Sequence, residues 1–197
     1  MTQKQQQWWL WLLIGGPIAV FSIWAMVDNT RLYFLTLLNS LTLASLYFIV
    51  ASGFTLVFGL MRNVNLAHGS LYLLGGYVAY TVAGATGWWV LAAAAGFLAA
   101  ALGGVLMQVL ILRHMQGQEL RQTMVTIGLS IVIADILLWI FTGQVHQMEA
   151  PEWLQGPIRG IPLINAYSAY RLSLLGFGIA IGLGLWWLLS RTRVGAM

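Results

Sequence analysis

The sequence contains no cysteine and few charged residues. The absence of cysteine excludes disulfides, thiolate catalysis and thiolate metal sites. Charged residues make up 7% of the 197 residues, whereas soluble domains contain about 25%. Hydrophobic residues make up 60%, and the mean hydropathy is +0.83. A water-soluble fold of this composition would expose large apolar patches, so the composition predicts an integral membrane protein.

The sequence also lacks a Ser/Pro-rich linker, a low-complexity tract and a block of like charges. We therefore expect residues 1–197 to form a single membrane domain. The formal net charge is +4, but the Lys and Arg residues are scattered singly between apolar runs. No basic patch is available for a nucleic-acid partner, and the basic residues instead indicate membrane topology.

Six apolar stretches have about the length that a membrane span requires. A hydrocarbon core about 30 Å thick needs roughly 20 helical residues. The stretches are residues 8–27, 32–61, 70–85, 88–112, 123–142 and 172–190. The first is too long for a signal peptide and has no A-x-A cleavage site, so we expect an uncleaved span. The predicted fold is an all-α polytopic bundle.

The basic residues favour cytoplasmic N- and C-termini. This orientation places most of them inside, namely Lys4, Arg62, Arg113, Arg121, Arg191 and Arg193. Only Arg31, Arg159 and Arg171 then lie outside. Tryptophans near the span ends, such as Trp88 and Trp187, fit headgroup positions. The long 143–170 connection lies outside and is either a docking site for a soluble partner or a plain connector.

Small and polar residues lie on one face of the second predicted span. Ser45, Ser52, Thr55 and Gly59 fall within about 80° of one another at about 100° per residue. This face is expected to point into the bundle. It either lines a solute pathway or provides ordinary small-residue helix packing.

The fifth predicted span carries Thr126, Ser130 and the acidic residue Asp135. The hydroxyl residues share one face, and Asp135 lies well round the helix near mid-span. An ionised carboxylate at the bilayer centre costs at least ~2.5 kcal/mol, so Asp135 should be protonated, paired or facing a polar cavity. A structural hydrogen bond or an interhelical contact is the competing interpretation.

The segment that joins the second and third spans is unusually polar. It connects a stretch of about 30 residues to one of only about 16, a pattern typical of a discontinuous helix. Asn65 could cap the next helix, His68 could bond freed carbonyls, and Gly69 could permit a tight turn. A cytoplasmic connector with capping residues is equally consistent. His68 has no second ligand at coordinating spacing, so we expect neither a metal nor another cofactor.

Four motifs resemble those of the branched-chain amino acid ABC permeases. Residues 53–59, read GFTLVFG, and residues 65–72, read NLAHGSLY, resemble that family's G-[FY]-T-L-[VI]-[FY]-G and N-[FL]-A-H-G signatures. Residues 126–130 resemble its fifth-span stretch, and residues 191–195 resemble the opening of its cytoplasmic R-x-G segment. The four motifs occur in the family order.

The resemblance implies a permease subunit in a bacterial cytoplasmic membrane. Such a subunit works with a second permease subunit, two cytoplasmic ATPases, an extracytoplasmic solute-binding protein and the surrounding lipid. The sequence has no G-x-x-x-x-G-K-[ST] motif, so this chain is not expected to be an enzyme, and ATP hydrolysis is expected on another chain. Members usually continue beyond the R-x-G segment, so the chain is expected to be C-terminally truncated.

The resulting hypothesis is alternating access for branched-chain amino acids, urea or short amides. The pathway candidates are Ser52, Thr55, Asn65, His68, Gly69, Thr126, Ser130 and Asp135. The candidates for ATPase coupling are Arg191, Arg193 and Gly195. A passive channel is the alternative, although no second polar re-entrant motif supports it. An intramembrane enzyme using His68 and Asp135 would lack any G-x-S-x-G or H-E-x-x-H arrangement.

Overall fold

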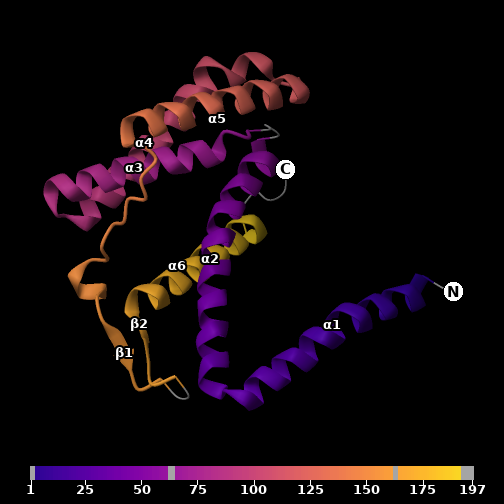
Figure 1. Ribbon diagram of the computed structural model, residues 1–197. Coiled ribbons are helices and arrows are strands. Elements are labelled where there is room, and N and C mark those ends of the chain that lie inside the picture. The colour runs from indigo at the N-terminus through magenta and orange to yellow at the C-terminus, as the bar shows by residue number, and fades with distance from the viewer. Residues whose placement is uncertain (1–2, 62–64, 162–163, 192–197) are drawn as a thin grey trace. The chain divides into compact units, whose positions relative to one another are not determined.

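A computed structural model describes residues 3–61, 65–161 and 164–191 (Figure 1). The long helices are α1 (Gln3–Asp28), α2 (Thr30–Met61), α3 (His68–Thr86), α4 (Trp89–Leu110), α5 (Glu119–Phe141) and α6 (Ala169–Arg191). Two short 3-10 helices are η1 (Leu112–Met115) and η2 (Glu152–Leu154). Two strands, β1 (Pro157–Arg159) and β2 (Ala166–Ser168), precede α6.

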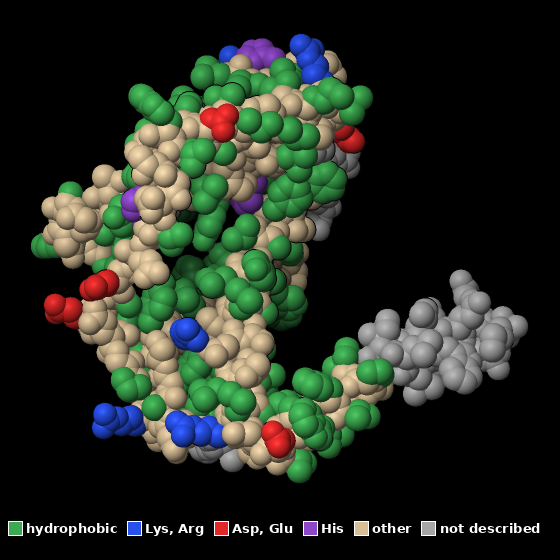
Figure 2. Space-filling view, viewed as in Figure 1, with side chains coloured by type: hydrophobic (Ala, Val, Ile, Leu, Met, Phe, Trp, Pro, Cys, Tyr) green, Lys and Arg blue, Asp and Glu red, His purple; other side chains and the backbone are tan. Residues whose placement is uncertain are grey.

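Each predicted span lies largely within one of the helices α1 to α6, so the all-α class is confirmed. In the described residues, four segments are long and apolar enough to cross a bilayer: Thr30–Gly59, Trp89–Leu110, Glu119–Phe141 and Ala169–Arg191. The predicted total of six spans and the predicted cytoplasmic termini stay predictions. Figure 2 shows hydrophobic side chains over much of the visible surface, as expected where lipid replaces water.

The described residues divide into two compact units. Unit 1 contains the residues up to Ile49 and Glu152–Trp186, and unit 2 contains Val50–Pro151 and the residues from Trp187. Helix α2 therefore begins in unit 1 and ends in unit 2. The single membrane domain expected for residues 1–197 stays a prediction.

In unit 2, α3 packs along α4 and against α5 (Figure 1). Gly75 of α3 and Gly96 of α4 are both buried where these helices approach. A Cβ at Gly75 would lie 2.9 Å from the Gly96 carbonyl oxygen. Small residues thus bring two backbones together, which is a main source of stability between helices in lipid.

In unit 1, the first part of α2 crosses α6. The Ser45 hydroxyl donates to the Leu174 carbonyl oxygen over 3.1 Å, and a Cβ at Gly178 would overlap that hydroxyl. The small face predicted on the second span therefore packs against another helix at Ser45. Beside this crossing, β1 and β2 form an antiparallel pair in the register Arg159 to Ala166. The sequence did not indicate these strands.

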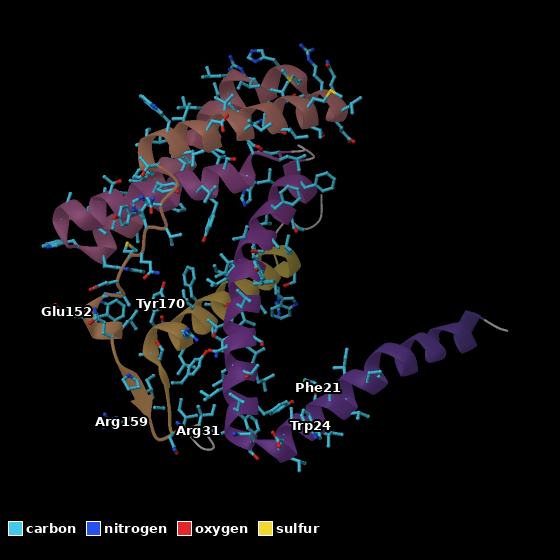
Figure 3. The ribbon with its side chains drawn as sticks, in the orientation of Figure 1. Phe21, Trp24, Arg31, Glu152, Arg159 and Tyr170 are labelled. Carbon is cyan, nitrogen blue, oxygen red and sulfur yellow. The ribbon has the colours of Figure 1, made fainter. Side chains whose placement is uncertain are left out.

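Helices α1 and α2 of unit 1 are separated by Asn29 alone. The Leu32 N–H donates to Asn29 Oδ1 over 3.0 Å, which caps the start of α2. Phe21 and Trp24 lie one helical turn apart near the end of α1 (Figure 3), with ring centroids 5.9 Å apart. Both rings are exposed, as expected for aromatic residues near a membrane interface.

Candidate functional site

The polar segment before α3 turns directly into that helix. Asn65 is buried, and its Oδ1 accepts a hydrogen bond from the Ala67 N–H over 3.0 Å. An amide oxygen in this position forms an Asx turn and satisfies a backbone donor that the helix leaves free. Asn65 therefore fixes the turn before α3, but the prediction that it caps the helix is wrong, because the N-cap residue is Ala67 and no side-chain capping bond forms there. Residues 62–64, which would distinguish a re-entrant break from a loop, lie outside the described residues.

Gly69 does not form the tight turn expected from the sequence. It is the second residue of α3, and it is not among the described glycines with a positive φ. The turn lies earlier, at Leu66 and Ala67, where the Asn65 side chain supplies the hydrogen bond. Gly69 therefore acts as an ordinary helical residue in this structure, and a side chain there would meet open space.

His68, the first residue of α3, packs against α2. A Cβ at Gly53 would lie 3.2 Å from His68 Nε2, so a larger residue would crowd the ring. The Phe54 ring meets the His68 ring edge-on, with centroids 6.2 Å apart. The GFTLVFG motif of α2 and the NLAHG motif are therefore in direct contact at His68. The expected bond from His68 to freed carbonyls is replaced by this ring packing.

Helix α5 holds the same segment from another side. The Leu66 N–H donates to Thr126 Oγ1 over 3.2 Å, and the Ser70 hydroxyl donates to the Ser130 carbonyl oxygen over 3.0 Å. Thr126 is completely buried, and its hydroxyl also donates within α5, 2.8 Å from the Gln122 carbonyl oxygen. Three motifs, residues 53–59, 65–72 and 126–130, thus meet around residues 65–70.

A cavity of about 480 Å³ opens beside this junction in unit 2. It is lined mainly by apolar side chains of α2, α3, α4 and η1. The polar residues on its wall are Asn65, His68, Tyr72 and Gln108. Volume and lining match small-molecule sites, in which a few polar groups orient a ligand among apolar walls.

The other predicted pathway residues are not among those that line this cavity. Thr55 is exposed, and its hydroxyl donates back to the Ala51 carbonyl oxygen over 2.8 Å. Ser52 is half-buried on α2. Asp135 is exposed on α5, and its position nine residues after Thr126 places it on the opposite face of the helix, about 180° away.

Arg191, one of the three residues predicted for ATPase coupling, is the last residue of α6 and is exposed. Arg193 and Gly195 lie outside the described residues. Within the part of the chain that the structure describes, no three His, Asp or Glu side chains gather where they could hold a metal ion.

Sequence reasoning missed several residues of the junction. Ser70 holds α3 to α5, and the buried Gln122 side chain donates to the Met115 carbonyl oxygen over 2.9 Å, which fixes the loop before α5. Gln108 offers the clearest overlooked signal, because it is the one amide side chain in α4, where only the Trp89 indole at the helix start also carries an N–H donor. A lone amide in an apolar helix needs a polar surrounding or a cavity.

A comparison with known protein families gives the origin of these motifs. The profile of the family described as branched-chain amino acid transport system / permease component matches residues 36–197. This match covers most of the chain and includes the three motifs that meet at residues 65–70. The chain belongs to this family. Four described helices have the length and hydropathy of membrane spans, so this permease-family chain is a multi-pass protein of a bacterial inner membrane.

Individual relatives in the permease family match shorter parts of the chain. The high-affinity branched-chain amino acid transport system permease protein LivH of Escherichia coli K12 is 42% identical over 77 residues, which are 35% of this chain and 24% of that protein. LivH of Salmonella typhimurium is 40% identical over an alignment of the same coverage. BraD of Pseudomonas aeruginosa is 42% identical over 48 residues, or 24% of this chain and 16% of BraD. No solved structure matches the chain.

Proposed function

We propose that the chain is a membrane-spanning permease subunit of an ATP-driven importer, and that its cargo is a branched-chain amino acid or a related small solute such as urea or a short amide. The observation that carries this proposal is the cavity beside residues 65–70, at the point where three motifs of the family converge. The names of the relatives, both branched-chain amino acid permease proteins, supply the solute class.

The cavity suits an amino acid with an aliphatic side chain. Its apolar wall, which includes Leu71, Val105 and Met107, would accept the hydrocarbon part of the solute. Asn65, His68 and Gln108 would hydrogen-bond to its polar end. This combination gives orientation through a few polar groups and affinity through apolar contact.

Alternating access would open this cavity to one side of the membrane at a time. Thr126 and Ser130 would act by holding residues 65–70 against α5, so that the segment moves with that helix. Ser52, Thr55, Gly69 and Asp135 would line further stretches of the pathway. Asp135 would line the pathway on the exposed face of α5, opposite Thr126, where a second permease subunit would complete the lining.

The energy would come from other chains. In the proposal two cytoplasmic ATPases bind near Arg191, Arg193 and Gly195, and a solute-binding protein docks on the extracytoplasmic side. The chain itself carries no P-loop motif, so its role is transport and not ATP hydrolysis.

Uptake of labelled leucine by the complete complex in proteoliposomes tests the proposal. His68→Ala should reduce uptake strongly, whereas His114→Ala, in the exposed end of η1, should not. Asn65→Asp keeps the acceptor for the Ala67 N–H and separates loss of folding from loss of solute contact. Normal transport by both Asn65→Ala and Asp135→Ala would show that the assigned lining is wrong. Solute flux without ATP would support a passive channel instead.

A further inference from the structure

A second polar cluster lies in unit 1 and includes none of the residues assigned to the pathway above. It consists of Asn39 and Thr42 on α2, Tyr167 on β2 and Arg171 in the first turn of α6, and is called the Arg171 cluster below. Thr42 and Tyr167 are 7% and 6% exposed. Two buried hydroxyls thus form the base of the cluster, while Asn39 and Arg171 are exposed at its surface.

The hydrogen bonds of this cluster fix the Asn39 side chain. The Tyr167 hydroxyl donates to Asn39 Oδ1 over 3.0 Å, and the Arg171 guanidinium donates to the same oxygen. The Thr42 hydroxyl lies 3.2 Å from the Tyr167 oxygen and 2.9 Å from the Leu38 carbonyl oxygen. Because the Tyr167 hydroxyl donates its proton to Asn39, the Thr42 hydroxyl can donate to the Tyr167 oxygen or to the Leu38 carbonyl oxygen. Both hydroxyls of the cluster therefore have hydrogen-bond partners.

Arg171 is held in place by this arrangement but is not neutralised by it. Its partner Asn39 is an uncharged amide, and only one guanidinium N–H donor is used in that bond. The remaining N–H donors lie in the guanidinium plane, where two of them can donate in parallel to the two oxygens of a carboxylate. A cation in the first turn of a helix is also opposed by the helix dipole, so helix stability does not account for Arg171.

The charged residues of unit 1 also favour the binding of an anion. Arg31 and Arg159 are exposed (Figure 3), and with Arg171 they outnumber the acidic residues Asp28 and Glu152 of the same unit. In the predicted orientation this end of the unit faces the extracytoplasmic side. A partly solvated cation in a unit with an excess of basic residues attracts oxyanions from solution.

We propose that the Arg171 cluster is a carboxylate-binding site that receives the α-carboxylate of an amino acid solute on the extracytoplasmic side. Arg171 makes the paired hydrogen bonds to the carboxylate, and the Asn39 amide N–H donates beside it. Tyr167 and Thr42 are positioning residues, since they act through Asn39. The assignment of the ligand rests on the proposed function, because that function supplies a zwitterionic solute.

Binding is tested first without transport, by the rate at which phenylglyoxal modifies Arg171 in membrane vesicles that contain the full chain. Leucine and 4-methylpentanoate should slow the modification, by roughly tenfold at ten times the dissociation constant. The amine 3-methylbutylamine, which lacks the carboxylate, should not slow it. Arg159 on β1 is the internal control and should react at the same rate in every condition.

The outcomes of this experiment separate the possible anions. Equal protection by inorganic phosphate would identify a general oxyanion or lipid-headgroup site and would overturn the carboxylate assignment. The absence of protection by any carboxylate would overturn the site itself. Protection by 4-methylpentanoate in a complex that transports no amino acid would instead keep the site and refute the proposed function.

The second test uses variants of the complete importer. Arg171→Gln should raise the KM for leucine uptake by about 10- to 100-fold, while the ATPase rate at saturating binding protein stays unchanged. Tyr167→Phe, which keeps the packing, should raise KM by a smaller factor without changing kcat. Arg159→Gln is the matched control: it removes a charge of the same unit but no proposed hydrogen bond to the carboxylate, so it should raise KM far less than Arg171→Gln.

Two results in this second test would overturn the proposal. Full recovery by Arg171→Lys would indicate a point charge anchored to lipid phosphate, because lysine cannot form the paired hydrogen bonds. A rise in the binding-protein concentration needed for half-maximal ATPase activity of Arg171→Gln would indicate that Arg171 contacts an acidic side chain of the docking partner.

Discussion

Most threonine hydroxyls in these helices are satisfied by their own helix. Thr55, Thr81, Thr86 and Thr123 each donate to the carbonyl oxygen four residues earlier. Thr126 makes the same kind of bond but also accepts the N–H of Leu66, sixty residues away. The same residue type thus has a purely local role at several positions and an added tertiary role at Thr126, as at Thr42 beside Tyr167. The sequence alone cannot separate these roles, because Thr123 and Thr126 fit the same helical pattern.

Replacing Thr126 tests whether that single acceptor holds the segment before α3. Thr126→Val keeps the volume but leaves the Leu66 N–H without its acceptor, which should lower the free energy of unfolding by about 1–3 kcal/mol. Thr126→Ser should remain near wild type. Urea unfolding in detergent, followed by tryptophan fluorescence, measures the change.

Thr123→Val is the matched control, since the Thr123 hydroxyl is bonded only within α5. It should cost less than Thr126→Val. Equal losses for the two valine variants would show that the hydrogen bond from Leu66 contributes nothing to holding residues 65–70.

Asp135 shows how a residue can be recognised from sequence while its surroundings cannot. Its acidity in an apolar span predicted a special environment, because an ionised carboxylate in lipid is costly. In the chain alone Asp135 is exposed and lies on the face of α5 opposite Thr126. The face of α5 with Thr126 therefore contacts residues 65–70, whereas the face with Asp135 is exposed in this chain. The proposed pathway includes both faces only if another chain covers Asp135.

At the scale of elements, hydropathy was sufficient to place the helices. The predicted 123–142 span lies within one residue of α5 at its C-terminal end and within four at its N-terminal end, because hydropathy responds to the apolar part and not to residues 119–122. Strands β1 and β2 were missed, since strands of three residues are too short to show a period of two in the sequence. The contact of His68 with Gly53 and the bonds from Leu66 and Ser70 were also invisible, because they depend on tertiary packing.

The contact between α3 and α4 gives a prediction at this scale. Gly75→Ala would place a methyl group 2.9 Å from the Gly96 carbonyl oxygen and 3.2 Å from the Ala100 Cβ. Since a backbone carbonyl cannot move aside alone, the helices must separate, and the free energy of unfolding should fall by about 1–3 kcal/mol. Denaturation of the purified protein in detergent measures this loss.

The next residue provides the control for that substitution. Gly76 lies on the same helix, and a Cβ there would meet nothing within 4 Å. Gly76→Ala should be neutral or stabilise α3 by up to about 1 kcal/mol, since alanine is the better helix former. If both alanine variants were equally stable, close approach at Gly75 would not be what holds α3 to α4.

For the whole molecule, membrane insertion and membrane orientation are two separate questions. Composition and family membership make the chain a multi-pass membrane protein, and the described helices α2, α4, α5 and α6 have the length to cross the bilayer. Orientation depends on where Lys and Arg residues fall relative to those spans. It is therefore a property of the chain in the membrane, which the contacts within unit 1 and unit 2 do not decide.

The absence of cysteine makes that orientation directly measurable with single cysteine substitutions. Gln116 precedes α5 and Gln147 follows it, and both side chains are exposed. With a cytoplasmic N-terminus, Gln147→Cys should react with a membrane-impermeant maleimide in intact cells, whereas Gln116→Cys should react only after the membrane is permeabilised. The reverse pattern would mean that the basic residues do not set the orientation as predicted. Reaction of both positions from the same side would show that α5 does not cross the membrane.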